Sequence, residues 1–157
     1  DSALKNGSFE SGEDGRRFWL GAPQAGVRFV PDAETVIEGE RSLRIEYAAR
    51  VGQSIRQEAA VEEGGAYHLE AWFRAQDIEG KGVQLVVKDT PTNGKTFVNT
   101  STFVNRTADW AKTSLDFTVP EGIYSVIVAV NRPTGEHESG GTLWIDACAL
   151  VRASEGA

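Results

Sequence analysis

Apolar and polar residues alternate with a period of two along several stretches of this chain, at 43–49, 67–75, 82–89 and 113–119. In the second stretch Tyr67, Leu69 and Phe73 alternate with polar residues. Successive side chains of a strand point to opposite faces of its sheet, so each stretch predicts a strand with one apolar and one polar face. No segment sustains the 3.6-residue period of an amphipathic helix, and the short helix-like run at 58–63 ends in two glycines.

Residues 124–130 are almost all apolar, which predicts a central strand. Strands with one apolar face bury it by packing two antiparallel sheets against each other. The pattern therefore predicts an all-β sandwich, in a single domain that spans residues 1–157. The apolar positions of the strands predict one core between the sheets, formed by Leu43, Ile45, Leu69, Phe73, Leu85, Val87, Leu115, Phe117, Val126 and Val128.

Charge and cysteine content narrow the possible partners. The net charge is −7, which argues against nucleic acid because phosphate binding needs a clustered excess of Lys and Arg. No apolar run approaches the ~18 residues of a membrane span, so no membrane partner is expected. Cys148 is the only cysteine, which rules out an internal disulfide, and its apolar strand predicts a buried and inert thiol.

Groups that carry catalysis are scarce. The chain has two histidines, His68 on a predicted strand and His137 in a polar loop, and neither has the spacing of a metal-binding pair. No serine lies in a G-x-S-x-G turn. A pair of carboxylates at glycosidase distance can arise by chance among 23 acidic residues, so it indicates nothing. The sequence predicts a domain without catalytic activity.

Five motifs follow one another along the chain: N-G-S-F-E at 6–10, G-E-R-S-L at 39–43, G-G-A-Y-H-L-E-A-W at 64–72, D-W at 109–110, and an apolar strand with an aspartate at 141–151. In this order they resemble the β-sandwich carbohydrate-binding modules of families four, nine and twenty-two, over nearly the whole chain. The resemblance implies a galactose-binding-like jelly roll of two antiparallel sheets. It also implies non-catalytic binding of a polysaccharide or oligosaccharide in a groove on one sheet.

A sugar-binding face should combine an aromatic ring for the C–H patches of a sugar with polar groups for its hydroxyls. The polar side of 67–75 has this composition: His68, Glu70, Trp72 and Arg74. Trp72 is the unusual residue there, either exposed for a ligand or packed beneath a loop. Neighbouring strands are expected to add further polar groups to this face: Arg56, Gln84, Lys88, Asn131 and Arg132.

The resemblance also implies a structural calcium ion. It assigns Glu10 of N-G-S-F-E and Asp146 of the last strand as side-chain ligands, with carbonyl groups near Ser8 and in the turn at Glu40. Calcium prefers such oxygen ligands. Modules of these families often have two consecutive acids in the last strand, whereas here Ala147 follows Asp146. The alternative is that both carboxylates pair with nearby arginines or with backbone amides.

The expected role is that of a monomeric module within a larger protein, secreted or at the cell surface, where weak sugar contacts raise the concentration of an attached enzyme near its substrate. The alternative is a structural or protein-interaction spacer with the same sandwich and no sugar site, because a fold does not fix a function. A Trp72 buried on a flat face favours the spacer, and an open groove around it favours sugar binding.

Overall fold

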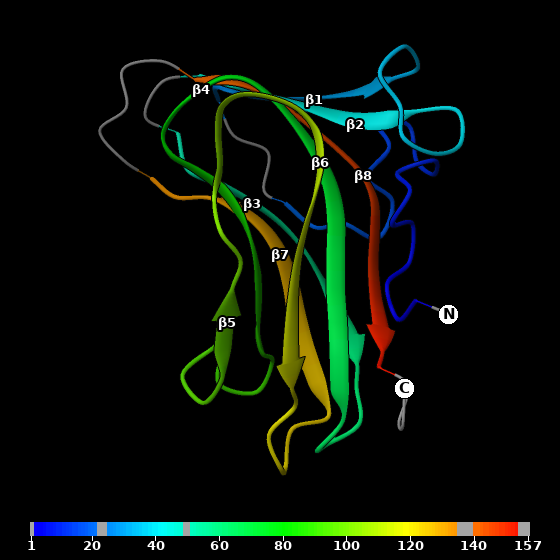
Figure 1. Cartoon of the computed structure of the whole chain (residues 1–157), viewed down its shortest axis with the longest axis vertical. Coiled ribbons are helices and arrows are strands. Elements are labelled where there is room, and N and C mark those ends of the chain that lie inside the picture. The colour runs from blue at the N-terminus through cyan, green and yellow to red at the C-terminus, as the bar shows by residue number, and fades with distance from the viewer. Residues whose placement is uncertain (1, 22–24, 49–50, 135–139, 154–157) are drawn as a thin grey trace.

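The computed structural model describes residues 2–21, 25–48, 51–134 and 140–153, and in these ranges it contains strands and turns without a helix (Figure 1). Accordingly, no helix in the described ranges is long and apolar enough to cross a membrane. The strands are β1 (Val27–Asp32), β2 (Ser42–Tyr47), β3 (Gln53–Ala60), β4 (Ala66–Asp89), β5 (Val98–Thr100), β6 (Val104–Thr118), β7 (Ser125–Arg132) and β8 (Gly141–Arg152). The predicted all-β class is confirmed.

The strands form two antiparallel sheets that share β4. We call them the first sheet, in the order β1-β2-β8-β4-β6, and the second sheet, in the order β3-β7-β4-β5. In Figure 1 the first sheet faces the viewer and the second lies behind it. This is the predicted sandwich, and β7 has the inner position between β3 and β4 that its apolar sequence predicts.

Strand β4 changes sheets within its length. Residues 67–76 pair with β8 in the first sheet, and residues 84–89 pair with β7 in the second. The bend between them includes Asp77 (φ 56°) and Gly82 (φ 102°) in the left-handed region. A Cβ on Gly82 would lie 2.1 Å from the carbonyl oxygen of Val104, so only glycine fits there. The sequence predicts two separate strands here, and the structure joins them into one.

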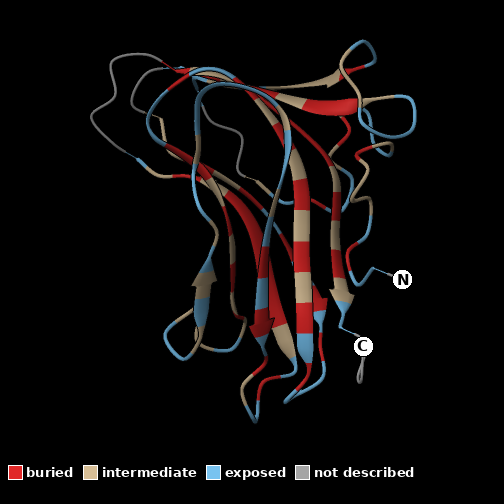
Figure 2. Cartoon of the chain, viewed as in Figure 1, coloured by how far each residue is buried: buried red, intermediate tan, exposed pale blue. Residues whose placement is uncertain are grey.

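The core lies between the sheets, and all ten residues predicted for it belong to it: Leu43, Ile45, Leu69, Phe73, Leu85, Val87, Leu115, Phe117, Val126 and Val128. Figure 2 shows the alternation along the N-terminal half of β4, where buried positions follow one another at every second residue. Cys148 is buried as predicted, and burial raises the pKa of its thiol to about 12, which keeps the thiol protonated and unreactive.

The N-G-S-F-E motif holds the N-terminal segment against the sandwich. The Asn6 side chain donates hydrogen bonds to the carbonyls of Gly15 (3.0 Å) and Arg17 (2.8 Å), which folds the following loop. Gly7 lies so close to β8 that a Cβ on it would be 1.9 Å from the carbonyl oxygen of Cys148. The segment therefore needs glycine at this position, because any side chain would push it off the sheet.

Two aromatic residues anchor the same segment in the core. The rings of Phe9 and Trp19 stack with centroids 5.4 Å apart, and both residues are buried. The indole N–H of Trp19 donates to the carbonyl of Asn6 at 2.9 Å. Trp19 is therefore a core residue.

Candidate functional site

The residues predicted to bind sugar do not share one face. One group alternates with the buried residues of the N-terminal half of β4 and lies on the outer face of the first sheet: His68, Glu70, Trp72 and Arg74. Another group lies on the outer face of the second sheet, on β4 and β7: Gln84, Lys88 and Asn131. The prediction of a single face was wrong, because β4 changes sheets and carries its polar side from one outer surface of the sandwich to the other.

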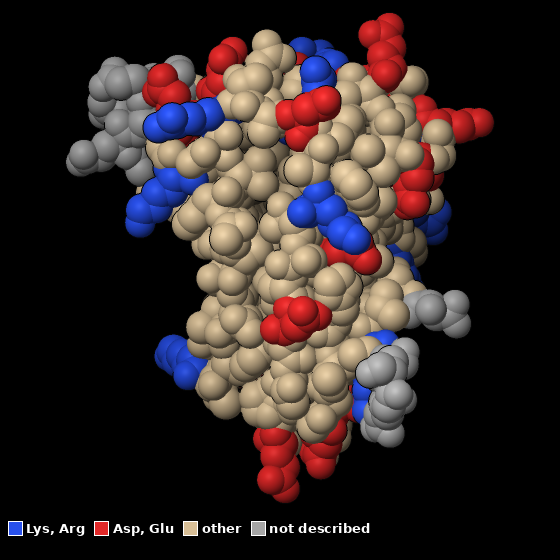
Figure 3. All heavy atoms as spheres, in the orientation of Figure 1, with Lys and Arg blue, Asp and Glu red and all other residues tan. Residues whose placement is uncertain are grey.

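Charged groups on the outer face of the first sheet pair with one another. His68 Nδ1 lies 2.7 Å from Asp116 Oδ1, and Lys112 Nζ lies 3.5 Å from Glu70 Oε2. Figure 3 shows this face, where basic and acidic side chains lie next to each other. Side chains already paired must give up these contacts before they can bind a ligand, which lowers their value as sugar ligands.

Arg74 also has internal partners. Its guanidinium lies 4.8 Å from the ring centroid of Trp144, in the stacked position favourable for a cation–π contact. The indole N–H of Trp144 in turn donates to Asp32 Oδ2 at 2.9 Å. Trp144 is buried, so this tryptophan and Arg74 stabilise the surface of the first sheet.

Cross-strand neighbours on the outer face of the second sheet form three rows: Ser54, Asn131 and Gln84; Arg56, Ala129, Val86 and Thr100; Glu58, Ile127, Lys88 and Val98. Adjacent strands are about 4.8 Å apart, so each row crosses a strip of roughly 10–15 Å. Within the described ranges, the side chains of Arg56, Gln84 and Asn131 make no hydrogen bond or ion pair. This face therefore offers donors and acceptors that the protein itself does not use.

The loop that follows β4 lies beside Lys88 at one end of this face. The Asp89 carboxylate accepts hydrogen bonds from the backbone N–H groups of Thr92 (2.7 Å), Gly94 (3.1 Å) and Phe97 (3.0 Å). The loop is thereby folded back, and a Cβ on Gly94 would lie 3.0 Å from the Lys88 side chain. Asp89 thus fixes the loop that lies against the Lys88 side chain.

The Asp89 loop should make stability depend on pH in the acid range. Burial alone raises the pKa of Asp89, but hydrogen bonds from Thr92, Phe97 and Thr96 outweigh it and lower the pKa to about 2. An unfolded aspartate titrates near 3.9, so this contribution is complete above about pH 4 and is lost as the pH falls towards 2. We expect Asp89→Asn to lower the Tm at neutral pH, by an amount that shrinks in acid.

The control for this prediction is Asp109→Asn, since the Asp109 side chain is exposed. Thermal unfolding of both variants and the parent between about pH 7 and 2 checks it. A Tm difference between Asp89→Asn and the parent that stays constant over this range would contradict the assigned role.

Arg132 is a structural residue, and its prediction as a ligand was wrong. The side chain is 1% exposed, and its Nη1 donates to the carbonyls of Ala48 (3.0 Å) and Val51 (3.1 Å). The guanidinium also lies 4.7 Å from the ring centroid of Tyr47. Its place at the end of an apolar strand suggested exposure, but it folds inward and holds the chain after β2 against β7.

A hollow of about 420 Å³ opens at the β3 edge of the second sheet, lined by Leu20, Gly21, Gln53, Ser54 and Arg56. Leu20 is fixed there because its backbone exchanges two hydrogen bonds of 2.8 Å with Arg56. Its side chain is 66% exposed, which places an apolar patch beside the polar rows. The sequence contains no signal for this hollow. Leu20 joins β3 through a single isolated bridge, and one bridged residue leaves no alternating pattern in the sequence.

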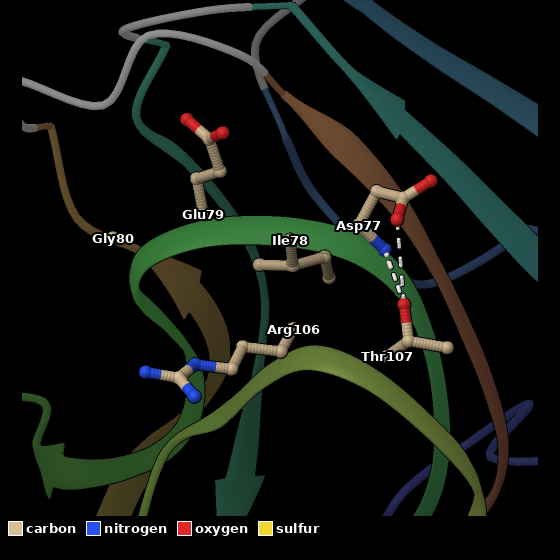
Figure 4. Close-up of a pocket in the computed structure, with 6 residues that line it drawn as sticks. All are labelled: Asp77, Ile78, Glu79, Gly80, Arg106 and Thr107. Atoms are coloured by element: carbon tan, nitrogen blue, oxygen red, sulfur yellow. Dashed lines mark hydrogen bonds between the residues drawn. The ribbon is translucent and has the colours of Figure 1, made fainter.

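A larger hollow, of about 630 Å³, lies at the bend of β4 (Figure 4). The Thr107 hydroxyl accepts the backbone N–H of Asp77 at 3.0 Å across it. In Figure 4 the charged ends of Asp77, Glu79 and Arg106 point away from one another. Binding sites need polar groups that converge on a ligand, so this hollow is a weaker candidate than the face of the second sheet.

Glu10 and Asp146, the predicted calcium ligands, lie in a cluster with Glu38. Glu10 Oε1 accepts the N–H of Glu40 at 2.8 Å, and Asp146 Oδ2 accepts the N–H groups of Ile37 (3.0 Å) and Glu38 (3.1 Å). Burial raises the pKa of Asp146, and the charge of Glu10 adds to it. Burial and the charges of Asp146 and Glu10 likewise raise the pKa of Glu38. Burial and the neighbouring like charges therefore both disfavour the ionised forms of Asp146 and Glu38.

The hydrogen bonds of Glu10 and Asp146 occupy oxygens that the predicted calcium ion would need. Backbone amides satisfy both carboxylates, as the alternative interpretation of the sequence had it. No group of three or more His, Cys, Asp or Glu side chains within the described ranges is arranged to hold a metal ion. Glu40 contributes its N–H to Glu10, and Ser8 borders a hollow beside Trp72. Two properties of the cluster suit a cation. Its carboxylate oxygens are ligands that calcium prefers, and its acidic side chains lie close enough to repel one another.

No catalytic constellation accompanies these surfaces in the part of the chain that the structure describes. His68 contacts Asp116 and Glu70 on an open sheet face, and neither of these contacts within the described ranges involves a Ser, Thr or Cys nucleophile. His137 lies outside the described residues. The polar face of the second sheet and the hollow beside it have the geometry of a binding surface.

Comparison with known proteins agrees with this geometry. Residues 1–136 match the family model CBM_4_9, described as a carbohydrate-binding domain. No curated protein matches the chain. Similar solved structures include a family 16 carbohydrate-binding module, with a TM-score of 0.70 and 20% identity over 95% of this chain and 99% of that one.

Two further similar structures are modules with a known carbohydrate ligand. A family 61 module in complex with β-1,4-galactotriose has a TM-score of 0.63 and 22% identity, over 98% of this chain and 99% of that chain. The CBM22-1 xylan-binding domain of Xyn10C from Paenibacillus barcinonensis has a TM-score of 0.62 and 16% identity, over 98% and 97%. At these identities the likeness establishes the fold.

Proposed function

This chain belongs to the CBM_4_9 family of carbohydrate-binding domains, and we propose that it binds its glycan on the outer face of the second sheet. The domain is a non-catalytic carbohydrate-binding module, so its function depends on which surface meets the sugar. The observation that carries the proposal is the set of unused polar side chains Arg56, Gln84 and Asn131 on adjacent strands.

The shape of this face supports the proposal. Its centre consists of Ala129 and Val86, whose side chains are short, while the longer Arg56, Gln84 and Lys88 stand around them. A sugar chain lying across the strands would rest on the low centre and meet amide and cationic donors at its edges. The exposed Leu20 at the β3 edge offers an apolar surface to sugar C–H groups.

The charge of the protein favours a neutral glycan. At a net charge of −7, the chain repels a polyanionic polysaccharide at long range. Arg56 and Lys88 are accompanied by Glu58 on the same face, so the face itself is not strongly basic. We therefore propose a neutral oligosaccharide or polysaccharide as the ligand.

The module is proposed to act as a monomeric part of a larger secreted or cell-surface protein. Hydrogen bonds from a few amides and cations give modest affinity, which is useful when a linked domain must stay near a polymer with many equivalent sites. Polysaccharides of this kind are met outside the cell, which supports the proposed location. Nucleic acid and membrane partners are not proposed.

A glycan array with the isolated domain, in calcium and in chelator, tests the proposed ligand. The expected result is retention on one or a few neutral β-linked polysaccharides. Absence of binding to every glycan, with and without calcium, would contradict the proposal and favour a spacer role.

We also propose that calcium binds between Glu10 and Asp146, the side-chain ligands that the resemblance assigns, where a cation would offset the repulsion between their carboxylates and that of nearby Glu38. Glu10 and Asp146 come from opposite ends of the chain, so an ion between them would hold the N-terminal segment to β8. Calcium was assigned from the resemblance, and the charge of the cluster supports it.

Calcium should then raise the Tm of metal-stripped protein. Ligand binding to the native state alone adds RT ln(1 + [L]/Kd), about 2.7 kcal/mol at a hundredfold excess over Kd. Asp146→Ala should remove this shift. Glu38→Gln should raise the Tm in chelator, because it removes one charge from the cluster, whereas Glu40→Gln is the matched control. A Tm of the parent that does not respond to calcium would refute the site.

A further inference from the structure

A second hollow lies on the opposite outer surface, beside Trp72 on the first sheet. Its volume is about 440 Å³, and it is lined by the N-terminal segment, by Glu38, by Glu70 and Trp72 of β4, and by residues 147–149 of β8. This is within the ~300–1,000 Å³ of small-molecule sites. The hollow shares no residue with the polar rows of the second sheet.

A β-bulge of β8 lies beside Trp72, at the side of the hollow that β8 lines. Glu70 pairs with Ala149 and Trp72 pairs with Asp146, so β8 has one extra residue opposite this part of β4. The bulge includes Ala147, whose φ of 50° is rare for a residue with a side chain. Ala147 and Ala149 line the hollow together with Trp72, and their short side chains leave space in it.

The N-terminal segment forms a fixed wall of this hollow. The N–H of Cys148 donates to the carbonyl of Gly7 at 2.8 Å, and the N–H of Ala3 donates to the carbonyl of Leu150 at 2.8 Å. The N–H of Leu150 also donates to Ser2 Oγ at 3.0 Å. The segment therefore runs alongside β8 as a bonded edge, and the hollow is formed before any ligand arrives.

The chemistry of the walls suits a neutral sugar. Trp72 is partly exposed and provides a ring face for the C–H groups of a sugar. Glu38 and Ser8 provide oxygens that accept hydrogen bonds from hydroxyl groups. Lys112 lies beside the hollow, 3.5 Å from Glu70. The carboxylates of Glu38 and Glu70 in its walls disfavour an anionic ligand.

We propose that the Trp72 hollow is a second carbohydrate site, which binds one neutral sugar residue, such as a chain end or a branch. This rests on the carbohydrate-binding function of the family and not on the face of the second sheet. Two sites on opposite surfaces let one module contact two chains of a polysaccharide, so avidity exceeds the affinity of either site.

The test uses neutral methyl glycosides (xyloside, glucoside, galactoside and arabinoside) with methyl glucuronide as the anionic comparison. The indole N–H signals of the four tryptophans are followed by NMR during titration. At least one neutral glycoside should shift the Trp72 signal with a millimolar Kd, and glucuronide should bind at least tenfold more weakly. The Trp72 signal is assigned from its loss in Trp72→Ala.

Variants separate this site from the second sheet. Ala149→Gln fills space in the hollow without removing the ring, and should weaken the glycoside at least tenfold even if Trp72→Ala fails to fold. Trp110→Ala, a partly exposed tryptophan on β6, is the matched control and should leave the Kd unchanged. In Gln84→Ala/Asn131→Ala the Trp72 shift should persist.

Three results would overturn the second site. The first is that no neutral glycoside moves the Trp72 signal. The second is that Ala149→Gln binds as well as the parent. The third is that Gln84→Ala/Asn131→Ala loses the Trp72 shift as well, since the two surfaces would then act as one site. Loss of polysaccharide binding in Gln84→Ala/Asn131→Ala with the Trp72 shift retained would support both sites.

Discussion

Phe117→Ala should lower the free energy of unfolding by about 3–5 kcal/mol, the usual loss for a large truncation in a packed core. Phe117 is 6% exposed and lies on β6, facing the space between the sheets. Its ring centroid is 5.8 Å from that of Tyr67 and 5.8 Å from that of Phe97. Removal of the ring leaves both partners facing a cavity that the rigid strands cannot close.

Urea or guanidinium unfolding measures this loss, with Val98→Ala as control. Val98 is 57% exposed on β5, so its truncation should change the stability by less than ~0.5 kcal/mol. A loss below about 1 kcal/mol for Phe117→Ala would mean that this face of β6 does not contribute to the core.

The double variant Gln84→Ala/Asn131→Ala should bind the polysaccharide at least ~30-fold more weakly, or about 2 kcal/mol. Gln84 and Asn131 are direct cross-strand neighbours, and each amide can both donate to and accept from sugar hydroxyls. Each hydrogen bond contributes about 0.5–1.5 kcal/mol, so loss of two amides gives this magnitude. Neither side chain bonds within the described protein, so the fold should be retained.

The matched control is Gln76→Ala, which removes the same amide group from the same strand where β4 is still in the first sheet. Titration calorimetry of both variants should show a loss for the double variant alone. Equal affinities of the double variant and the parent would place the glycan elsewhere on the molecule.

The strands and the core were predictable because burial of one strand face leaves a direct trace in the sequence. The alternation of Leu69 and Phe73 with polar residues predicts which side chains face inward, and the structure buries both.

What the alternation could not reveal is which sheet a polar face belongs to. Trp72 and Gln84 lie on polar positions of one strand, and a period of two gives no sign that the strand bends between them. The bend depends on backbone contacts far apart in sequence, such as the approach of Gly82 to Val104. The predicted ligand set was for this reason divided between two surfaces.

Two of the three residues of the acidic cluster could be predicted from the sequence. The resemblance pointed to Glu10 and Asp146, and these two groups do interact. Glu38 was missed because it lies in an irregular turn between β1 and β2, where no periodicity marks which side chain faces the strand ends. Arg132 was misassigned for a related reason: a charged residue at a strand end is usually exposed, and here backbone carbonyls bind it inside.

The most direct test of the central claim is backbone amide chemical-shift mapping with the glycan that the array selects. Shifts should be largest for Ser54, Arg56, Gln84, Ala129 and Asn131, which form the central rows of the second sheet. Smaller shifts beside Trp72 are compatible with the second site. Shifts confined to the first sheet, with the rows of the second sheet unchanged at saturation, would contradict the proposed binding face.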